Sequence, residues 1–195
     1  MSDKVLKVLM FVVVISFQAL ESDGQVPKAW FAAGSHPKEY EMSIDRGSAH
    51  GGKASAYLKS VVPRTSGFGT LMQTFRADAF RGKRVRMSGF VKSQDADGAG
   101  LWMRVDGAKT GEVLAFDNMD DRSIRGTTEW KKYEIVLDVP EESEVVAFGL
   151  LLAGRGKAWI DDLRFDVVGK EVPTTGKGRF SAGPPKAPSN LNFED

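Results

Sequence analysis

The stretch Trp159–Phe165, Trp-Ile-Asp-Asp-Leu-Arg-Phe, is the segment that decides the fold class. It follows the glycine-rich turn Gly154–Gly156 and is the last patterned segment before a tail rich in proline and glycine. Apolar and polar residues alternate along its second half, as in a strand with one buried face. The stretch therefore predicts the closing strand of an antiparallel β-sandwich.

The same alternation recurs along the chain, in short segments bounded by Gly, Asp, Asn or Pro. No segment keeps an apolar period of 3.6 residues for long, so we expect little helix beyond one turn at Ala77–Arg81. We predict an all-β fold, an antiparallel β-sandwich of the jelly-roll type. The other expected strands are Glu39–Asp45, Ala54–Ser60, Thr70–Phe75, Arg84–Lys92, Leu101–Asp106, Glu112–Phe116, Lys132–Asp138 and Val145–Leu152.

Val145–Leu152 differs from the other predicted strands because it is apolar at nearly every position. A strand of this kind is covered on both faces, so we place it at the centre of a sheet. Its outer face is then expected to line either a groove or a partner.

Three regions are expected from the composition along the chain. Residues 1–20 predict a signal peptide, because Lys4 and Lys7 precede an apolar run of about ten residues, too short for a bilayer span of about 20. A valine-rich strand or an anchor is the alternative. Residues 27–169 form the predicted β-sandwich. Residues 170–195 read as an extended tail that ends in a possible extra strand, Asn190–Glu194, or is disordered.

The charge balance argues against nucleic acid as a partner. The 195 residues carry 27 basic and 26 acidic side chains, a net charge of +1, whereas nucleic-acid binders usually present a basic face. No helix-turn-helix pattern is seen. The chain contains no cysteine, which excludes disulfides, thiolate metal sites and a cysteine nucleophile. With 42% hydrophobic residues it is long enough to bury one core.

Catalytic motifs are missing from the sequence. The two histidines, His36 and His50, come with no Gly-x-Ser-x-Gly elbow and no ordered third partner. Paired carboxylates occur, but Asp161 and Asp162 are adjacent in a strand and should point to opposite faces. We therefore expect no enzyme. A small hydrolase or lyase that uses a carboxylate or His36 remains the third hypothesis.

A candidate binding surface lies on the predicted strand Leu101–Asp106. Trp102, Arg104 and Asp106 share one face of that strand, because side chains alternate with period two. An aromatic ring and a guanidinium on one face suit a sugar, which stacks its C–H patches and hydrogen-bonds its hydroxyls. The opposite face is wholly apolar and is predicted to be core: Leu101, Met103 and Val105.

The segment that follows is expected to complete this surface with Asp117, Asn118 and Arg122. In the alternative interpretation Trp102 packs under a loop and Arg104 pairs with Asp106 or Asp117. The remaining tryptophans are interpreted mainly as packing residues, because large aromatic side chains are usually mostly buried: Trp30, Trp130 and Trp159.

The chain resembles a group of small bacterial proteins of undefined role. Four segments together carry the resemblance: Phe31–Pro37, Phe116–Met119, Gly126–Trp130 and Trp159–Leu163. Some members of that group carry transcription-regulator labels. The resemblance covers residues 28 to 195. More broadly, the chain is similar to the galactose-binding-like jelly roll of carbohydrate-binding modules, through Trp130 and the Asp-Asp closing strand. The resemblance implies the fold and a ligand class, and no activity.

The resemblance also implies a structural calcium. In such modules an acidic residue of the closing strand holds the ion together with a glutamate from the opening segment. Here that implies Asp161, with Glu21 or Glu194 as the remote ligand. The alternative is that the aspartates cap turns by accepting backbone hydrogen bonds.

We interpret the chain as a non-catalytic binding module for a carbohydrate or a similar polyhydroxylated ligand. A protein-interaction or structural β-sandwich is the second hypothesis, with a protein partner in place of the sugar. The protein is expected to be secreted or periplasmic if residues 1–20 are a cleaved signal, with no membrane span after cleavage, and cytoplasmic otherwise.

Overall fold

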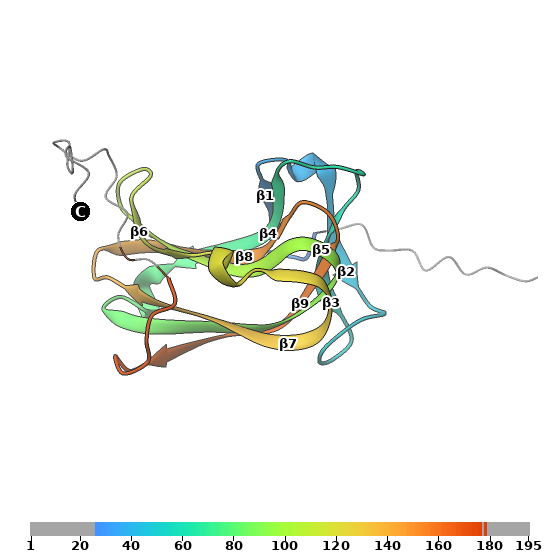
Figure 1. Cartoon of the computed structure of the whole chain (residues 1–195). Coiled ribbons are helices and arrows are strands. Elements are labelled where there is room, and N and C mark those ends of the chain that lie inside the picture. Colours follow the sequence, from blue (N-terminus) through green and yellow to red (C-terminus); the bar gives the residue numbers. More distant parts are fainter. Residues whose placement is uncertain (1–25, 177, 179–195) are drawn as a thin grey trace, which may run out of the picture.

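The computed structural model describes residues 26–176 and 178, which form two packed layers of β-strands (Figure 1). The predicted signal peptide, Glu21 and the predicted strand Asn190–Glu194 lie outside the described residues. The strands are β1 (Phe31–Gly34), β2 (Tyr40–Asp45), β3 (Ser55–Ser60), β4 (Phe68–Arg76), β5 (Lys83–Gly107), β6 (Val113–Asp117), β7 (Ile124–Val139), β8 (Ser143–Ala153) and β9 (Lys157–Val168).

Short 3-10 helices are the only helical elements of the described residues. They are η1 (Pro37–Glu39), η2 (Ala77–Ala79) and η3 (Asp120–Arg122). The second of them confirms the single turn expected at Ala77–Arg81. Within the described part of the chain, no helix has the length and apolar character that a membrane crossing requires. The all-β prediction is confirmed.

Strand β5 belongs to both layers. Its first part pairs with β7 and β9, and its second part, Gly98–Gly107, pairs with β8 and β6. The pairing with β7 shifts register between Val91 and Ala99, where the strand passes from one layer to the other. The two predicted strands Arg84–Lys92 and Leu101–Asp106 are therefore one continuous strand.

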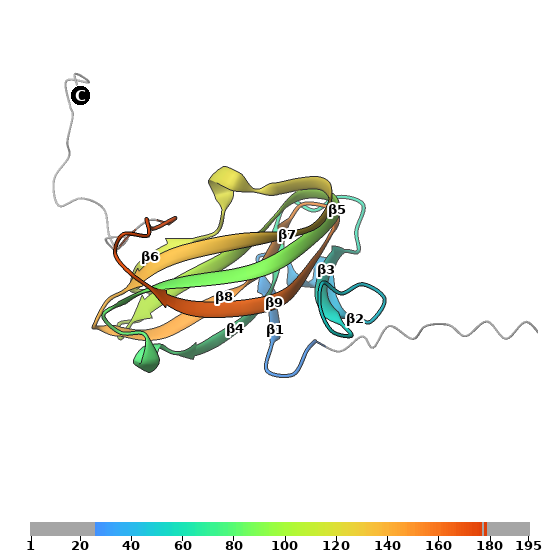
Figure 2. The ribbon, with the colours of Figure 1, turned by 90° about the horizontal axis from the view of Figure 1, so that it is seen from below.

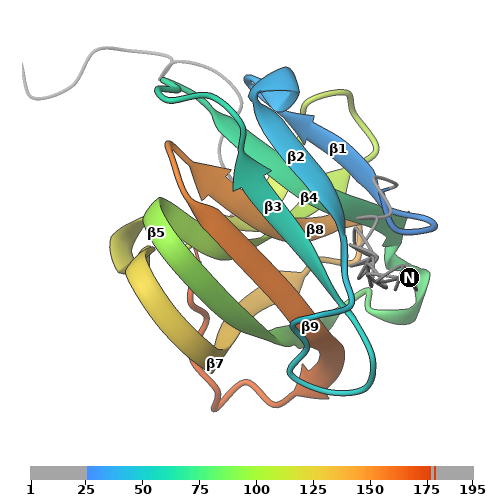
Figure 3. The ribbon, with the colours of Figure 1, turned by 90° about the vertical axis from the view of Figure 1, so that its right-hand side faces the viewer.

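The two layers share this strand and enclose the core. The upper layer of Figure 1 has the order β1-β4-β8-β5-β6, and the lower layer has the order β7-β5-β9-β3-β2 (Figures 1, 2 and 3). Leu101, Met103 and Val105 are fully buried, which confirms that this row faces the core. Burial of one such side chain contributes about 1.5–3 kcal/mol.

Strand β8 lies between β4 and β5, as its continuous apolar pattern predicts. Leu150 and Leu152 are fully buried in the core, whereas Leu151 and Ala153 lie on the outer face and line a cavity. The sequence gives no signal for β1, because its four residues, Phe-Ala-Ala-Gly, show no alternation. It pairs with β4 and forms one edge of the upper layer.

Candidate ligand-binding site

A cavity of about 650 Å³ opens on the outer face of the upper layer. Strands β1 and β6, the two edge strands of that layer, contribute residues to its two sides. The volume falls within the range of about 300–1,000 Å³ that is typical of ligand pockets. The lining residues are Ala33, Gly34, Phe68, Thr70, Met72, Trp102, Arg104, Phe116, Asn118, Leu151 and Ala153.

Trp102 is held in a fixed orientation at the floor of this cavity. Its exposed fraction is only 7%, and its indole Nε1 donates a hydrogen bond of 2.7 Å to the hydroxyl of Thr70. That hydroxyl in turn donates to the carbonyl of Leu150 at 2.8 Å. A buried indole N–H needs such a partner. Trp102 therefore lines the cavity without being the open platform that the sequence suggests.

Arg104 is the basic group of the cavity. Its guanidinium pairs with the carboxylate of Asp106 at 2.8 Å, as the alternative interpretation expects. The Arg104 side chain is nevertheless 43% exposed. Phe116 lies directly across from Arg104 on β6 and lines the same cavity. Asp106 orients the guanidinium and lines a smaller neighbouring cavity of about 300 Å³.

Asp117 and Arg122 belong to a hydrogen-bond network at the edge of β6. Asp117 Oδ2 accepts hydrogen bonds from Arg122 at 2.6 Å and from the hydroxyl of Thr175 at 2.5 Å. Its Oδ1 accepts from the amide of Met119 at 2.8 Å. Burial raises the pKa of the Asp117 carboxyl, but these hydrogen bonds outweigh burial and the net pKa lies below its usual value.

The six predicted ligand-binding residues thus fall into three groups. Trp102, Arg104 and Asn118 line the 650 Å³ cavity. Asp117 lines a second cavity, of about 520 Å³, which also contains Asn118. Asp106 and Arg122 serve mainly as charge partners of the others.

The two aspartates of the closing strand act together on one loop. Asp162 has a positive φ of 50°, and the pairing of β5 with β9 shifts register beside it. This bulge breaks the expected alternation. Asp161 Oδ2 accepts from the amides of His50 and Gly51, and Asp162 Oδ2 lies 2.7 Å from His50 Nδ1. The prediction that the two side chains diverge is therefore wrong.

The calcium site stays a prediction. Asp161 uses both carboxylate oxygens on backbone amides, since Oδ1 accepts from its neighbour Asp162. The described residues contain no cluster of three or more Asp, Glu or His side chains placed for a metal ion. The expected remote ligands, Glu21 and Glu194, lie outside the described part of the chain.

His36, the residue of the enzymatic hypothesis, lies in an exposed loop. Its Nδ1 is 3.0 Å from the hydroxyl of Ser35, and that oxygen accepts a hydrogen bond from the amide of Phe68. The contact joins the loop after β1 to the start of β4, which is a structural use of the side chains.

The tryptophans interpreted as packing residues lie against other side chains. Trp159 is 6% exposed and donates from Nε1 to Asp45 at 2.8 Å. Trp30 packs edge-on against Phe148 with ring centroids 5.4 Å apart. Trp130 is half-buried, with its ring 6.1 Å from that of His50.

Sequence reasoning missed the lining residues from β4, above all Phe68, Thr70 and Met72. They reach the cavity because β4 pairs with β8, and β8 pairs with the second half of β5. These strands are far apart in the chain, and the alternation pattern of a strand does not predict which other strand pairs with it. Only Thr70 has a local signal, a polar residue at the start of an apolar strand.

Comparison with known proteins identifies the class of fold. The xylan-binding domain of family 22 from Paenibacillus barcinonensis Xyn10C superposes with a TM-score of 0.53 and 18% identity, over 75% of this chain and 90% of that domain. The C-terminal family 22 carbohydrate-binding module of Clostridium thermocellum Xyn10B gives 0.52 and 16%, over 77% and 92%. The chain has the β-sandwich fold of carbohydrate-binding modules.

A relative in sequence is the "Uncharacterized HTH-type transcriptional regulator YbfP" of Bacillus subtilis (strain 168). It is 48% identical over 170 residues, which are 86% of this chain. The chain spans only 57% of the length of that relative. This match confirms the resemblance to proteins that carry regulator labels. No family model matches the chain.

Proposed function

We propose that the domain is a non-catalytic carbohydrate-binding module whose ligand occupies the Trp102 cavity. The observation that carries the proposal is the cavity itself, which combines aromatic rings, an exposed guanidinium and a side-chain amide on one sheet face. The shared fold with carbohydrate-binding modules supports the ligand class.

The chemistry of the cavity suits a sugar. Phe116 offers ring surface to the C–H patches of a pyranose, whereas the largely buried Trp102 forms the floor beneath it. Arg104 and Asn118 offer a hydrogen-bond donor fork and an amide to its hydroxyls. The Arg104–Asp106 pair fixes the guanidinium before the ligand arrives, which lowers the ordering cost of binding.

The test is calorimetric titration of the full chain with soluble oligosaccharides. Xylohexaose comes first, because a xylan-binding domain is among the proteins that share this fold. Arg104→Ala is expected to weaken binding at least about tenfold, since a hydrogen bond to a charged group contributes about 1.5–3 kcal/mol. Arg155→Ala is the control, an exposed arginine that is ion-paired with Asp97 and absent from the cavity lining.

Saccharide recovered unchanged after incubation would agree with a binding module and disagree with a hydrolase or lyase. A folded protein that binds no member of a broad saccharide panel would contradict the proposal. It would favour the protein-interaction hypothesis, with the same cavity as the contact surface.

A second candidate function follows from the relative. Its regulator label favours a role in which this sandwich senses a carbohydrate for a DNA-binding part of a longer protein. The measurement is the operator affinity of the full-length relative with and without the saccharide that the isolated domain binds. Equal affinities would contradict this role and leave carbohydrate binding itself untouched.

A further inference from the structure

The segment after β9 is fastened across the gap between β6 and β7. We call residues Gly169–Gly176 the strap. Its main fastening is Thr175, whose amide donates to the carbonyl of Val136 at 2.9 Å. The amide of Val136 donates back to the Thr175 hydroxyl at 2.8 Å, and that hydroxyl donates to Asp117 at 2.5 Å. One residue thus links the edge of β7 to the edge of β6.

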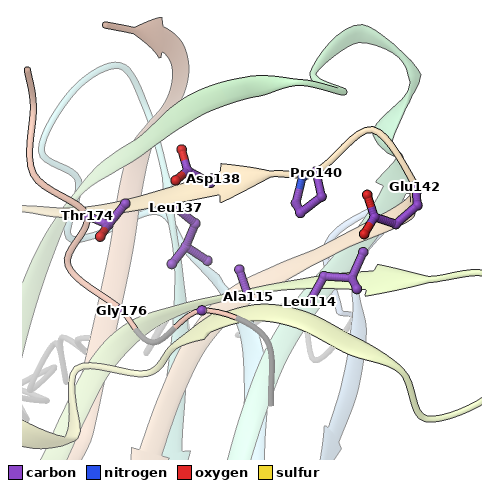
Figure 4. A pocket seen from close by; sticks show the side chains of 9 residues that line it. Leu114, Ala115, Leu137, Asp138, Pro140, Glu142, Thr174 and Gly176 are labelled. Carbon is purple, nitrogen blue, oxygen red and sulfur yellow. The ribbon is translucent and has the colours of Figure 1, made fainter. Parts of the chain in front are cut away.

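Gly176 occupies a slot that admits no side chain. A Cβ at this position would lie 2.4 Å from the carbonyl oxygen of Phe116 and 2.7 Å from Leu137 Cδ2. Figure 4 shows Gly176 between the strand that carries Leu137 and the strand that carries Ala115. The close approach on both sides means that the strap is seated between the two layers.

The first half of the strap is fastened independently. Arg84 Nη1 donates to the carbonyls of Lys170 and Val172, at 2.9 and 2.6 Å. Lys170 Nζ donates to Asp138 at 2.7 Å. In Figure 2 the chain crosses from the end of β9 past β7 towards β6. The strap is therefore held in its first half as well as at Thr175 and Gly176.

The strap forms the wall of a cavity that continues the ligand site. Thr175 and Gly176 line the 520 Å³ cavity described above. This cavity shares Phe116 and Asn118 with the Trp102 cavity, so the two lie next to each other at β6. Each alone has the volume of a ligand pocket. Two adjacent cavities of this size have room for more units of a linear ligand than either cavity alone.

We propose that the 520 Å³ cavity is a second subsite, which receives further units of a neutral, linear oligosaccharide and uses the strap as its wall. The inference rests on the proposed function. The exposed carboxylates of Asp120 and Asp121 line this cavity, and Asp117 lies beside them with its oxygens already hydrogen-bonded. The subsite therefore offers mostly acceptors for hydroxyl protons and repels an acidic sugar. Ligand and strap stabilise each other by the same coupling free energy.

The test compares xylohexaose with xylobiose on the full chain by calorimetry. Gly176→Ala is expected to weaken xylohexaose at least tenfold and xylobiose less than twofold. Its matched control is Gly178→Ala, because a Cβ at Gly178 meets nothing within 4 Å. Thr175→Val removes the hydroxyl fastening and should act like Gly176→Ala, whereas Thr175→Ser keeps the hydroxyl and should bind as the wild type.

The outcomes separate the two proposals. Equal affinity of the wild type for the two sugars, or equal losses for both sugars in the strap variants, overturns the subsite and leaves the proposed function standing. A wild type that binds neither sugar nor any other saccharide overturns both. A galacturonate hexamer that binds as tightly as its neutral galactose counterpart overturns the charge argument. Equal wild-type affinities for the two sugars overturn the subsite even if a strap variant fails to fold, and Thr175→Val against Thr175→Ser then tests the strap without a new clash.

Discussion

Replacing Trp102 by alanine should cost more in stability than the position of this residue at a cavity suggests. The side chain is 93% buried, since its exposed fraction is 7%. Truncation of a buried aromatic residue costs about 3–5 kcal/mol. Loss of the 2.7 Å hydrogen bond to Thr70 adds about 1 kcal/mol, because the Thr70 hydroxyl keeps its bond to the Leu150 carbonyl. We expect a loss of about 4–6 kcal/mol in total.

This loss is large against a typical unfolding free energy of about 5–15 kcal/mol. Trp102→Phe keeps most of the ring and should cost about 1–2 kcal/mol, so it is the variant to use in binding experiments. Urea unfolding followed by far-UV circular dichroism measures both values. A loss below about 1 kcal/mol for Trp102→Ala, with an unchanged m-value, would refute the packing that we describe.

Two other perturbations follow from the contacts. Gly149→Ala should destabilise the protein by about 1–3 kcal/mol in thermal unfolding, because a Cβ there would lie 2.2 Å from the Leu71 carbonyl oxygen. The control Gly47→Ala should behave as the wild type, because the nearest atom to its Cβ would lie at 3.4 Å. Acid should loosen the strap, because both carboxyl groups that hold it have lowered pKa values. The pKa of Asp117 lies below its usual value. The hydrogen bond from Arg84 lowers the pKa of Asp138 to about 2, and burial only partly opposes this effect. An unfolded aspartate titrates near about 3.9, so the ionised carboxylates stabilise the strap fully above that pH and progressively less as the pH falls towards 2. The protection factor of the Val136 amide in hydrogen exchange, which corrects for the intrinsic effect of pH, should fall over this window. An unchanged protection factor would speak against the fastening.

The strands were predictable because a strand with one buried face alternates apolar and polar residues, and this pattern can be read from the sequence. Alternation finds Tyr40–Asp45 and Ser55–Ser60 within one or two residues of their bounds. The unbroken apolar run of β8 correctly indicates a central strand. The failure lies in β5, where polar and glycine residues between Ser93 and Gly100 look like a turn. They form a bend within one strand, and hydrogen bonds to β7 and β8 on either side hold it.

Only those residues of the candidate site that lie on one strand could be predicted from the sequence. Trp102 and Arg104 could be placed on one face by period two, since that relation is local to a strand. Their neighbours Phe68 and Met72 come from β4, which reaches them only through pairing with β8. In the closing strand the period-two rule itself fails. It predicts that Asp161 and Asp162 point to opposite faces, but the positive φ of Asp162 brings both carboxylates to one loop.

The sequence by itself determined the all-β class, the buried row Leu101–Met103–Val105 and the shared face of Trp102 and Arg104. All three follow from the period of side chains along a strand, which the chain carries locally. The tertiary structure alone decided how much of Trp102 is covered, which strands surround the cavity and that Gly176 is seated between β6 and β7. These depend on contacts between segments far apart in the chain, for which a single sequence holds no local signal.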